Sequence, residues 1–555
     1  MDSALETDFD LVCSLSNKGH YDYIIVGSGI GGGILARTLA LESPESKSRV
    51  LLIEKGDLTF HTHCLNGSRP HWQRGGTKGP SQDNDVIYQD VKKRVSTTPD
   101  SDPYAGGPVY CLGGRSTVWG LFAPKIDDNT LMKYFPSCIT KELKEKYYDI
   151  AIELLTNGSQ MSINNPDPHP RMSNSDDNAR IASMLQDAKE KLDGAIGEWS
   201  EKVNDTKKKY ENASTAPIAA QFASEVLYNF PQGAYSTVDG LLELLYAKNQ
   251  SLTLLTNTEV LSLDLDNTEA SSFVRPKAGQ PTTVKAKTVV LCAGTIGTAT
   301  IALNSGLQRL NWLVGKGLTD HEIWGVRIAK DRDRDVSLLH AQFPFSMPPN
   351  LPKPCQQPLK LQKMIKIQGQ PALLNVCQNA DTFLSRKVLS ENTQNFNSQG
   401  KKILFSNNEP AGCDTLNITL EFRAKLRNNN MVHITPTSQP VIRIKRKGIF
   451  GEKDESAQKD MQELATTIRN KFLFKDQAIN GIQDAPRLKL ADFGVVAHEV
   501  GTMRMPKPNG GANARDGSVV TCDLQFEGVE NLYVCDLSVF PPATWKHDER
   551  TELIT

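Results

Sequence analysis

A glycine-rich turn between an apolar strand and a helix, near the start of the chain, constrains the fold most. Residues 21–26 (YDYIIV) have the composition of a buried strand, the glycine run GSGIGG follows, and residues 34–41 have a helical pattern. In this pattern Gly27 permits a tight turn, Gly29 lets the backbone approach a pyrophosphate, and Gly32 lets the helix pack closely on the strand. The helix N-terminus directs N–H groups toward the phosphates. The turn therefore predicts a dinucleotide-binding β-α-β unit.

The second strand of this unit, over residues 50–53, ends at Glu54. A carboxylate at this position accepts hydrogen bonds from the hydroxyls of an adenosine ribose and would repel a 2′-phosphate. Strand, glycines, helix and terminal carboxylate together favour a dinucleotide site over a glycine turn of purely steric origin. They do not distinguish FAD from NAD.

The rest of the chain predicts an α/β protein of at least two interleaved domains, because 555 residues exceed what one compact core holds. Helical patterns dominate residues 126–215, and strand-like runs return at 252–256, 260–265 and 288–291. Alternating runs such as LNITLEFRAKL and PVIRIKRK then indicate an antiparallel sheet, followed by a helix over 459–471. We expect a Rossmann-like FAD-binding domain assembled from separated segments, with an interleaved α+β substrate domain built on the antiparallel sheet. The expected segments are 20–125 (with an excursion at 56–110), 216–330 and 491–555 for the first domain, and 126–215 and 331–490 for the second.

Composition narrows the choice of partner. Lys and Arg number 63 against 64 Asp and Glu, so there is no large basic field for nucleic acid or anionic lipid, and a small molecule is the expected partner. The N-terminus lacks the basic start and apolar run of a secretory signal, no stretch is apolar enough to span a bilayer, and we expect a soluble, cytoplasmic protein. Six Asn-x-Ser/Thr triplets leave open the alternative of a secreted glycoprotein.

The cysteines and histidines do not suggest a metal site. The ten cysteines form no CxxC pair and no dense framework, so we expect mostly reduced thiols. His61, His63 and His71 lie near Cys64, but their spacing and loop context are poor for coordination, and we predict no bound metal.

Beyond the glycine turn, further segments resemble the glucose-methanol-choline (GMC) oxidoreductase family and occur in that family's order. The resemblance covers the expected FAD-domain segments and says little about residues 126–215 or 331–490. The matching segments are LGGRSTVWG (112–120), VVLCAGTIG (289–297) with NSG (304–306), VGKGLTDH (314–321), HEVGTMRM (498–505) and NLYVCDLSVFP (531–541).

The resemblance implies FAD as the cofactor and assigns further residues to its site. It implies that the loop holding Gly113, Gly114 and Ser116 lies beside the flavin. It also implies that the backbone of Val260 contacts the adenine and that Asp536 lies near the pyrophosphate and ribityl chain. The loop looks closest to the pyranose-oxidase-like branch, in which a histidine of this loop attaches the flavin covalently. Val118 stands in that neighbourhood here, so we expect non-covalent FAD.

The resemblance further implies oxidation of a CH–OH group of an alcohol or sugar-like substrate by hydride transfer to flavin N5. His498 occupies the position of the family's catalytic histidine and is the expected general base, a role suited to a side chain that titrates near neutrality. His547 is the expected second residue, which orients the substrate oxygen, although Asp548 replaces the usual following proline. Oxygen or another acceptor would reoxidise the flavin.

Two alternatives stay open at this point. Some proteins that resemble this family keep FAD but act as hydroxynitrile lyases, through acid-base chemistry at the same histidine position. The unusually charged HDER segment at 547–550 also fits an inactive flavin-binding homologue.

Overall fold

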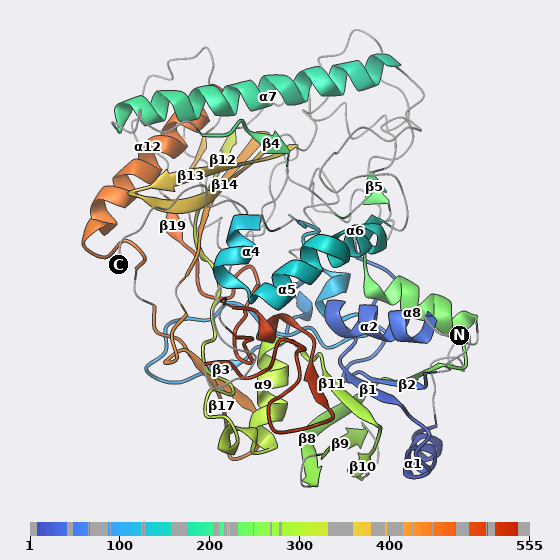
Figure 1. Ribbon diagram of the computed structural model, residues 1–555. Coiled ribbons are helices and arrows are strands. Elements are labelled where there is room, and N and C mark those ends of the chain that lie inside the picture. Colours follow the sequence, from blue (N-terminus) through green and yellow to red (C-terminus); the bar gives the residue numbers. More distant parts are fainter. Residues whose placement is uncertain are drawn as a thin grey trace.

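The structure is a computed structural model of the chain (Figure 1). The residues that it describes are 8–41, 48–64, 66, 87–88, 90–123, 126, 128–156, 175–203, 210–215, 219, 221–222, 231–232, 234–247, 249–266, 269–276, 280–330, 359–378, 394–396, 414–424, 426–446, 448–472, 488–506, 508 and 517–541.

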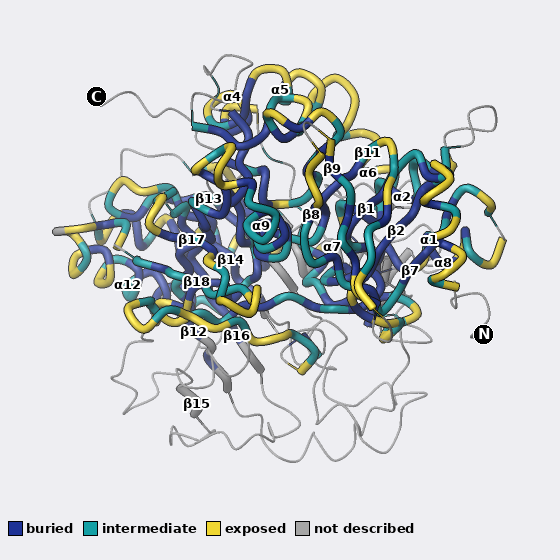
Figure 2. Tube along the Cα trace, turned by 90° about the horizontal axis from the view of Figure 1, so that it is seen from below, coloured by how far each residue is buried: buried dark blue, intermediate teal, exposed yellow. Residues whose placement is uncertain are grey.

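Five short strands from distant parts of the chain form a parallel sheet, in the order β20-β11-β1-β2-β7. Every neighbouring pair is parallel, and β1 lies between β11 and β2. Figure 2 shows the labelled strands β1, β2, β7 and β11 largely in the colour of buried residues, as expected for apolar strands covered on both faces. The strands are β1 (Tyr23–Val26), β2 (Val50–Ile53), β7 (Leu252–Leu255), β11 (Thr288–Leu291) and β20 (Leu532–Val534).

Different elements cover the two faces of this sheet. On one face, α2 (Ile30–Leu41) and α8 (Thr237–Tyr246) pack against Ile25 and Leu52. On the other face, α9 (Gly294–Asn304) and α4 (Asp128–Tyr134) contribute to the core around Ile24, Leu51 and Leu291. The mixed α/β class with a parallel sheet is therefore confirmed.

A second, mostly antiparallel sheet of seven strands has the order β15-β12-β16-β14-β13-β4, with β19 also paired to β12. Two long helices, α7 (Ser175–Lys202) and α12 (Asp454–Phe472), lie along one side of it (Figure 1). The expected antiparallel sheet is thus present. The strands are β4 (Ser214–Thr215), β12 (Glu322–Lys330), β13 (Leu359–Ile367), β14 (Gln370–Gln378), β15 (Gln394–Phe396), β16 (Asp414–Phe422) and β19 (Lys489–Leu490).

The two faces of this second sheet differ in chemistry. Strand register places Leu420, Leu374 and Leu361 on the face that packs against α7 and α12. The opposite face carries buried polar side chains, which alternate along each strand with the apolar ones of the first face. Asn375 and Glu421 are among these polar side chains. Each strand therefore has an apolar side for the helices and a polar side that is also withdrawn from water.

Smaller elements complete the fold. Two three-stranded sheets have the orders β10-β9-β8 and β17-β18-β3, and β5 pairs with β6. The remaining strands are β3 (Ser96–Thr97), β5 (Gln221–Phe222), β6 (Pro231–Gln232), β8 (Thr258–Asp266), β9 (Glu269–Pro276), β10 (Thr282–Val284), β17 (Met431–Ile434) and β18 (Pro440–Arg443). The remaining helices and helical turns are α1 (Phe9–Asn17), η4 (Gly114–Thr117), α5 (Ser137–Glu142), η5 (Leu143–Tyr147), α6 (Tyr148–Thr156), η6 (Leu307–Arg309), η8 (Gly451–Lys453) and η10 (Leu537–Val539).

Most of the described cysteines are unbridged, in line with the expectation of mostly reduced thiols, but one disulfide is present. Cys138, in α5, bonds to Cys522, which is 384 residues away in the sequence. Spacing along the chain could not indicate this pair, because folding alone brings the two thiols together. Six other described cysteines are unbridged. None of the helices in the described ranges is long and apolar enough to cross a membrane.

Candidate active site

The glycine-rich turn after β1 has the geometry of a phosphate cradle. Gly27 has a φ of 98°, which only glycine adopts readily, and a Cβ on Gly32 would come within 1.9 Å of the Gly27 carbonyl oxygen. A Cβ on Gly31 would come within 2.1 Å of the carbonyl oxygen of Cys535. Gly29 differs, because a Cβ there would meet no protein atom within 4 Å. The turn is packed on one side and open at Gly29, as a bound pyrophosphate requires.

Glu54 closes this turn from the end of β2. Its Oε2 accepts hydrogen bonds from the Ser28 amide at 3.0 Å and the Ser28 hydroxyl at 2.6 Å, and its Oε1 accepts from the Gly56 amide at 2.9 Å. Burial raises the pKa of Glu54, and the hydrogen bonds from Ser28 oppose that shift. The carboxylate therefore stabilises the turn itself, and its Oε1 keeps a free acceptor position.

The glycine-rich loop at 112–120 meets the same turn. Gly113 has a left-handed backbone, with φ of 84°, and its amide donates to the Ser28 hydroxyl at 2.9 Å. The Ser116 hydroxyl donates to the Gly113 carbonyl at 2.6 Å and accepts from the Thr237 amide at 3.1 Å, at the start of α8. A Cβ on Gly114 would lie 3.3 Å from Cα of Gly29. Gly113, Gly114 and Ser116 thus lie beside the cradle.

Asp536 lies at the carboxyl end of β20 and ties that strand to α9. Its Oδ2 accepts from the Gly294 amide at 2.9 Å and the Thr298 hydroxyl at 2.5 Å, and its Oδ1 caps η10 through the Ser538 amide at 2.8 Å. Burial raises the pKa of Asp536, and its hydrogen bonds oppose that shift. This carboxylate therefore holds the start of α9 next to the cradle.

Val260 lies on β8 just beyond Glu54. The Thr258 amide, two residues earlier, donates to the Glu54 carbonyl at 3.0 Å, while the Val260 side chain lies in the apolar core. Its backbone is therefore near the strand end at which the adenosine is expected.

His498 lies on a segment that runs antiparallel to residues 319–321. The amides of Thr319 and Val500 donate to each other's carbonyls at 3.0 and 2.8 Å, which brings His321 opposite His498. The two imidazole rings meet edge to face, with centroids 5.3 Å apart. Two histidines, rather than one, therefore meet at this point of the structure.

Withdrawal from water keeps both rings uncharged. Burial lowers the pKa of His498 to about 4, although the charge of Glu499 opposes this shift more strongly than the charge of Arg115 adds to it. Burial also lowers the pKa of His321 well below the ordinary value, and the neighbouring His498 adds to the shift. A neutral imidazole can accept a proton, so the pair has the protonation state of a base near pH 7.

Arg115 anchors the His498 segment to the glycine-rich loop. Its Nη1 donates to Oε2 of Glu499 at 2.8 Å and also to the Ala497 carbonyl, while Tyr104 donates to Oε1 of Glu499. Ala497 has a positive φ of 58°, so this turn is strained and needs such support. Burial alone would raise the pKa of Glu499, but the ion pair with Arg115 outweighs it and the pKa is lowered.

The expected residues fall into two neighbouring groups. Those of the cradle come together, and His498 lies on the segment that Arg115 links to the glycine-rich loop at 112–120. His547 and His71 lie outside the described residues. His63 is buried, and its Nε2 lies 3.0 Å from the Trp119 carbonyl oxygen. The sequence did not predict the roles of Arg115 and His321, although both lie within the motifs LGGRSTVWG and VGKGLTDH. The charge of Arg115 and the imidazole of His321 were the features that could have indicated a role.

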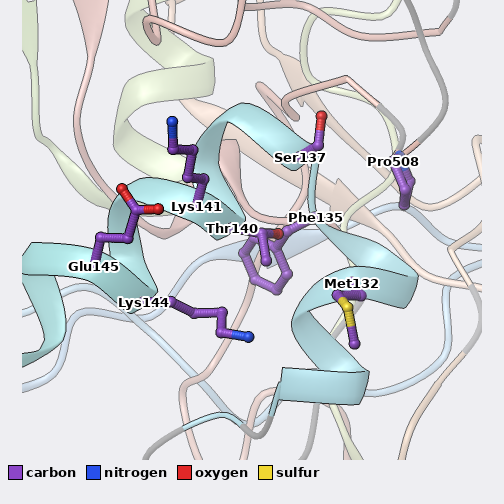
Figure 3. Close-up of a pocket in the computed structure, with 8 residues that line it drawn as sticks. All are labelled: Met132, Phe135, Ser137, Thr140, Lys141, Lys144, Glu145 and Pro508. Carbon is purple, nitrogen blue, oxygen red and sulfur yellow. The ribbon is translucent and has the colours of Figure 1, made fainter.

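A separate cavity of about 370 Å³ lies elsewhere, between α4, α5 and η5 (Figure 3). Phe135 and Met132 line it together with Lys144, Glu145 and Pro508. None of the predicted site residues contributes to it, so it is distinct from the cradle and the histidine pair.

Comparison with known proteins supports the family resemblance in the C-terminal part of the chain. Residues 435–548 match the family model described as GMC oxidoreductase, which confirms the resemblance to this family over that part of the chain. The fold is similar to the crystal structure of pyridoxine 4-oxidase from Mesorbium loti, with a TM-score of 0.55 and 16% sequence identity, over 94% of this chain and 95% of that one. At this identity the likeness shows the fold alone. No curated protein matches the sequence.

Proposed function

We propose that this protein is an FAD-dependent oxidoreductase that oxidises a CH–OH group of a small alcohol or sugar-like molecule, with His498 as the general base. One observation carries the proposal: the segment that matches the GMC family holds His498 and also packs against the glycine cradle. Cys535 and Asp536 of this segment lie against Gly31 and the start of α9. The turn proposed to bind the cofactor and the segment that holds the proposed base are thus in contact within one folded unit.

The residues present fit FAD. The open space at Gly29 and the amides at the start of α2 would receive the pyrophosphate, and Glu54 would accept from the ribose hydroxyls. Gly113, Gly114 and Ser116 would lie beside the flavin, with Asp536 near the ribityl chain and the backbone of Val260 near the adenine. The likeness of the flavin loop to the pyranose-oxidase-like branch remains part of the proposal. With Val118 where a covalent anchor is expected, we propose non-covalent FAD.

When bound, FAD supplies the hydride acceptor, N5 of its flavin. His498 takes the proton of the substrate hydroxyl, and its low pKa keeps the ring available as a base. His321 packs edge to face against that ring and restricts its orientation. Arg115 and Glu499 hold the turn at Ala497 so that the base stays in place. His547 remains our proposal for the residue that orients the substrate oxygen.

Anaerobic flavin reduction tests the proposal. Purified holoprotein should be yellow, release FAD on heat or acid denaturation, and lose its flavin absorbance when mixed without oxygen with a suitable sugar, aryl alcohol or other small alcohol. Retention of the flavin by precipitated protein would contradict the non-covalent assignment. Cleavage of a cyanohydrin without bleaching would favour a lyase, and FAD that no alcohol bleaches would favour an inactive flavin-binding protein. The same assay in air distinguishes an oxidase from an enzyme that needs another acceptor.

A further inference from the structure

Two unbridged cysteines lie next to each other at the carboxyl end of the parallel sheet. Cys292 follows β11 and Cys535 follows β20, and these two strands pair in parallel, with Leu291 opposite Val534. The Cys535 amide donates a hydrogen bond to the Leu291 carbonyl at 2.9 Å, so the ladder extends to this position. The two cysteines are therefore neighbours on adjacent strands, although they lie far apart in the sequence.

Their side chains point to the same face of the sheet and meet there. Both belong to the apolar cluster that includes Val290 and Tyr533, each two residues earlier in its strand, as the alternation of strand side chains requires. The thiols of Cys292 and Cys535 form a hydrogen bond with each other. Neighbouring strands lie about 4.7–4.9 Å apart, and a disulfide joins Cα atoms that are about 4.4–6.8 Å apart. The backbone therefore has the spacing that a disulfide needs.

This pair of thiols lies directly against the glycine-rich turn. A Cβ on Gly32 would come within 2.9 Å of the Cβ of Cys292, and a Cβ on Gly31 would come within 2.1 Å of the Cys535 carbonyl oxygen. The residue after Cys535 is Asp536, whose carboxylate holds the start of α9. A covalent bond between the two sulfurs would thus fix the C-terminal strand beside the cradle.

Cys535 is the more reactive thiol of the two. It is partly exposed, whereas Cys292 is 5% exposed. The hydrogen bond from Cys292 lowers the pKa of Cys535, against the opposing effects of burial and of Asp536, while burial raises the pKa of Cys292 well above its ordinary value. Because the thiolate is the nucleophile in thiol oxidation, Cys535 is the group that attacks an oxidant. Cys292 is then placed to resolve the product.

We propose that Cys292 and Cys535 are a redox-active dithiol, which hydrogen peroxide converts to a disulfide that fixes β20 to β11 beside the cradle. This inference goes beyond the proposed function and does not depend on it, because peroxide from any source would serve.

The reaction has two steps. The Cys535 thiolate attacks one oxygen of peroxide, and the O–O bond breaks to give a sulfenic acid and hydroxide, which becomes water with the proton that Cys535 released. The Cys292 sulfur then attacks the Cys535 sulfur, the S–S bond forms, and the hydroxyl leaves with the Cys292 proton as a second water. Both thiols are oxidised, and one peroxide is reduced to two waters.

Disulfide mapping tests the pair. Holoprotein treated with hydrogen peroxide, blocked with iodoacetamide and digested at acid pH without reductant should yield a peptide that links Cys292 to Cys535. Cys535→Ser should remove that linked peptide. Cys13→Ser is the matched control, because Cys13 is another partly exposed, unbridged cysteine, and this variant should keep the linked peptide. Cys111, which is also near the cradle but whose Sγ donates to the Gly114 carbonyl, should remain a thiol.

The unfolding temperature tests whether the disulfide fixes β20. Peroxide-treated protein should unfold at a higher temperature than untreated protein, because the new bond closes a long loop of the unfolded chain. Cys535→Ser should show no such rise. A linked peptide without a higher unfolding temperature would refute the fixing of β20.

A second variant traps the intermediate and keeps the test decisive if Cys535→Ser fails to fold. Cys292→Ala retains the attacking thiol and lacks the resolving one, so peroxide should leave a sulfenic acid at Cys535 that dimedone labels, whereas wild type should be labelled far less. Absence of the linked peptide in peroxide-treated wild type, or equal dimedone labelling of wild type and Cys292→Ala, would overturn the proposal whether or not alcohols bleach the flavin.

Discussion

Nη1 of Arg115 lies 2.8 Å from Oε2 of Glu499, across 384 residues of sequence. The Glu499 side chain is 1% exposed, whereas that of Arg115 is 30% exposed, so the carboxylate depends on the arginine for its charge compensation. The contact joins the loop beside the cradle to the turn that carries His498. The position of the candidate base therefore depends partly on the glycine-rich loop that holds Arg115.

Arg115→Met should leave Glu499 buried without its counter-charge. Breaking a buried pair from one side costs about 3–5 kcal/mol, and the partial exposure of Arg115 favours the lower end of that range. The double variant Arg115→Met with Glu499→Gln should regain part of the loss, because the buried group is then neutral. Urea unfolding of the two single variants and the double variant measures this coupling. Strictly additive losses would show that the pair contributes nothing of its own.

His498→Ala should keep FAD bound and slow flavin reduction by roughly 10²–10⁴-fold, the usual contribution of a positioned acid-base group. His433→Ala is the matched control, since that histidine is exposed on β17. Anaerobic stopped-flow reduction measures both. A wild-type rate in His498→Ala would remove this residue from the mechanism and leave the FAD assignment intact.

The pH profile of that reduction should lack a histidine step near neutrality. Because the pKa of His498 is lowered to about 4, the ring is already neutral at pH 6 and gains no further base character as the pH rises to 7. This differs from the ordinary histidine titration that the sequence alone suggests. We expect the step attributable to His498 between about pH 3 and 5, and stopped-flow rates in wild type and His498→Ala would locate it. A step at pH 6.5 that is lost in the variant would contradict this assignment.

Gly29→Val should abolish retention of FAD without unfolding the protein. A Cβ there meets no protein atom within 4 Å, so the backbone tolerates a substitution and the added side chain would extend into the space expected for the pyrophosphate. Gly197→Val is the control, because Gly197 is an exposed glycine of α7 with equal space around it. The ratio of flavin absorbance to protein concentration measures FAD retention, and circular dichroism shows whether each variant is folded. Normal flavin content in Gly29→Val would rule out the cradle.

Glu421 should make the protein less stable at alkaline pH. Burial raises the pKa of Glu421 to about 8, above its value in the unfolded chain. The folded state therefore binds this proton more tightly than the unfolded chain does. The stabilisation from the bound proton is complete below about pH 4 and is lost as the pH rises through 8. Glu421→Gln removes this titration, so its stability relative to wild type should increase from pH 5 to pH 9, by at most about 1.4 kcal/mol per pH unit. Urea unfolding at several pH values measures the difference, and parallel curves would refute it.

Local patterns predicted some elements well and long-range contacts poorly. The strands at 50–53 and 288–291 were predicted with the observed bounds, because each is a short apolar run with polar flanks. Helix α2 begins at Ile30 rather than residue 34, since the glycines that resemble a turn are held in the first helical turn by packing against Cys535 and Gly27.

The parts of the candidate site that the sequence did not predict depend on contacts between distant segments. Arg115 meets Glu499 and Cys138 meets Cys522 only after folding, and no periodicity in the chain encodes either pair. The orientation of Glu421 likewise follows from the register of β16 against β12, which the alternation within one strand cannot give.

The edge position of β20 has a consequence for biosynthesis. Strand β11 leaves the ribosome roughly 240 residues before its neighbour β20, which corresponds to about 12–48 s at 5–20 residues per second. Throughout that interval one side of β11 presents unpaired backbone groups and its apolar side chains lack the cover that the C-terminal segment provides. We therefore expect nascent chains arrested before residue 530 to bind chaperones that recognise exposed apolar strands, and release of the full-length chain to end that association.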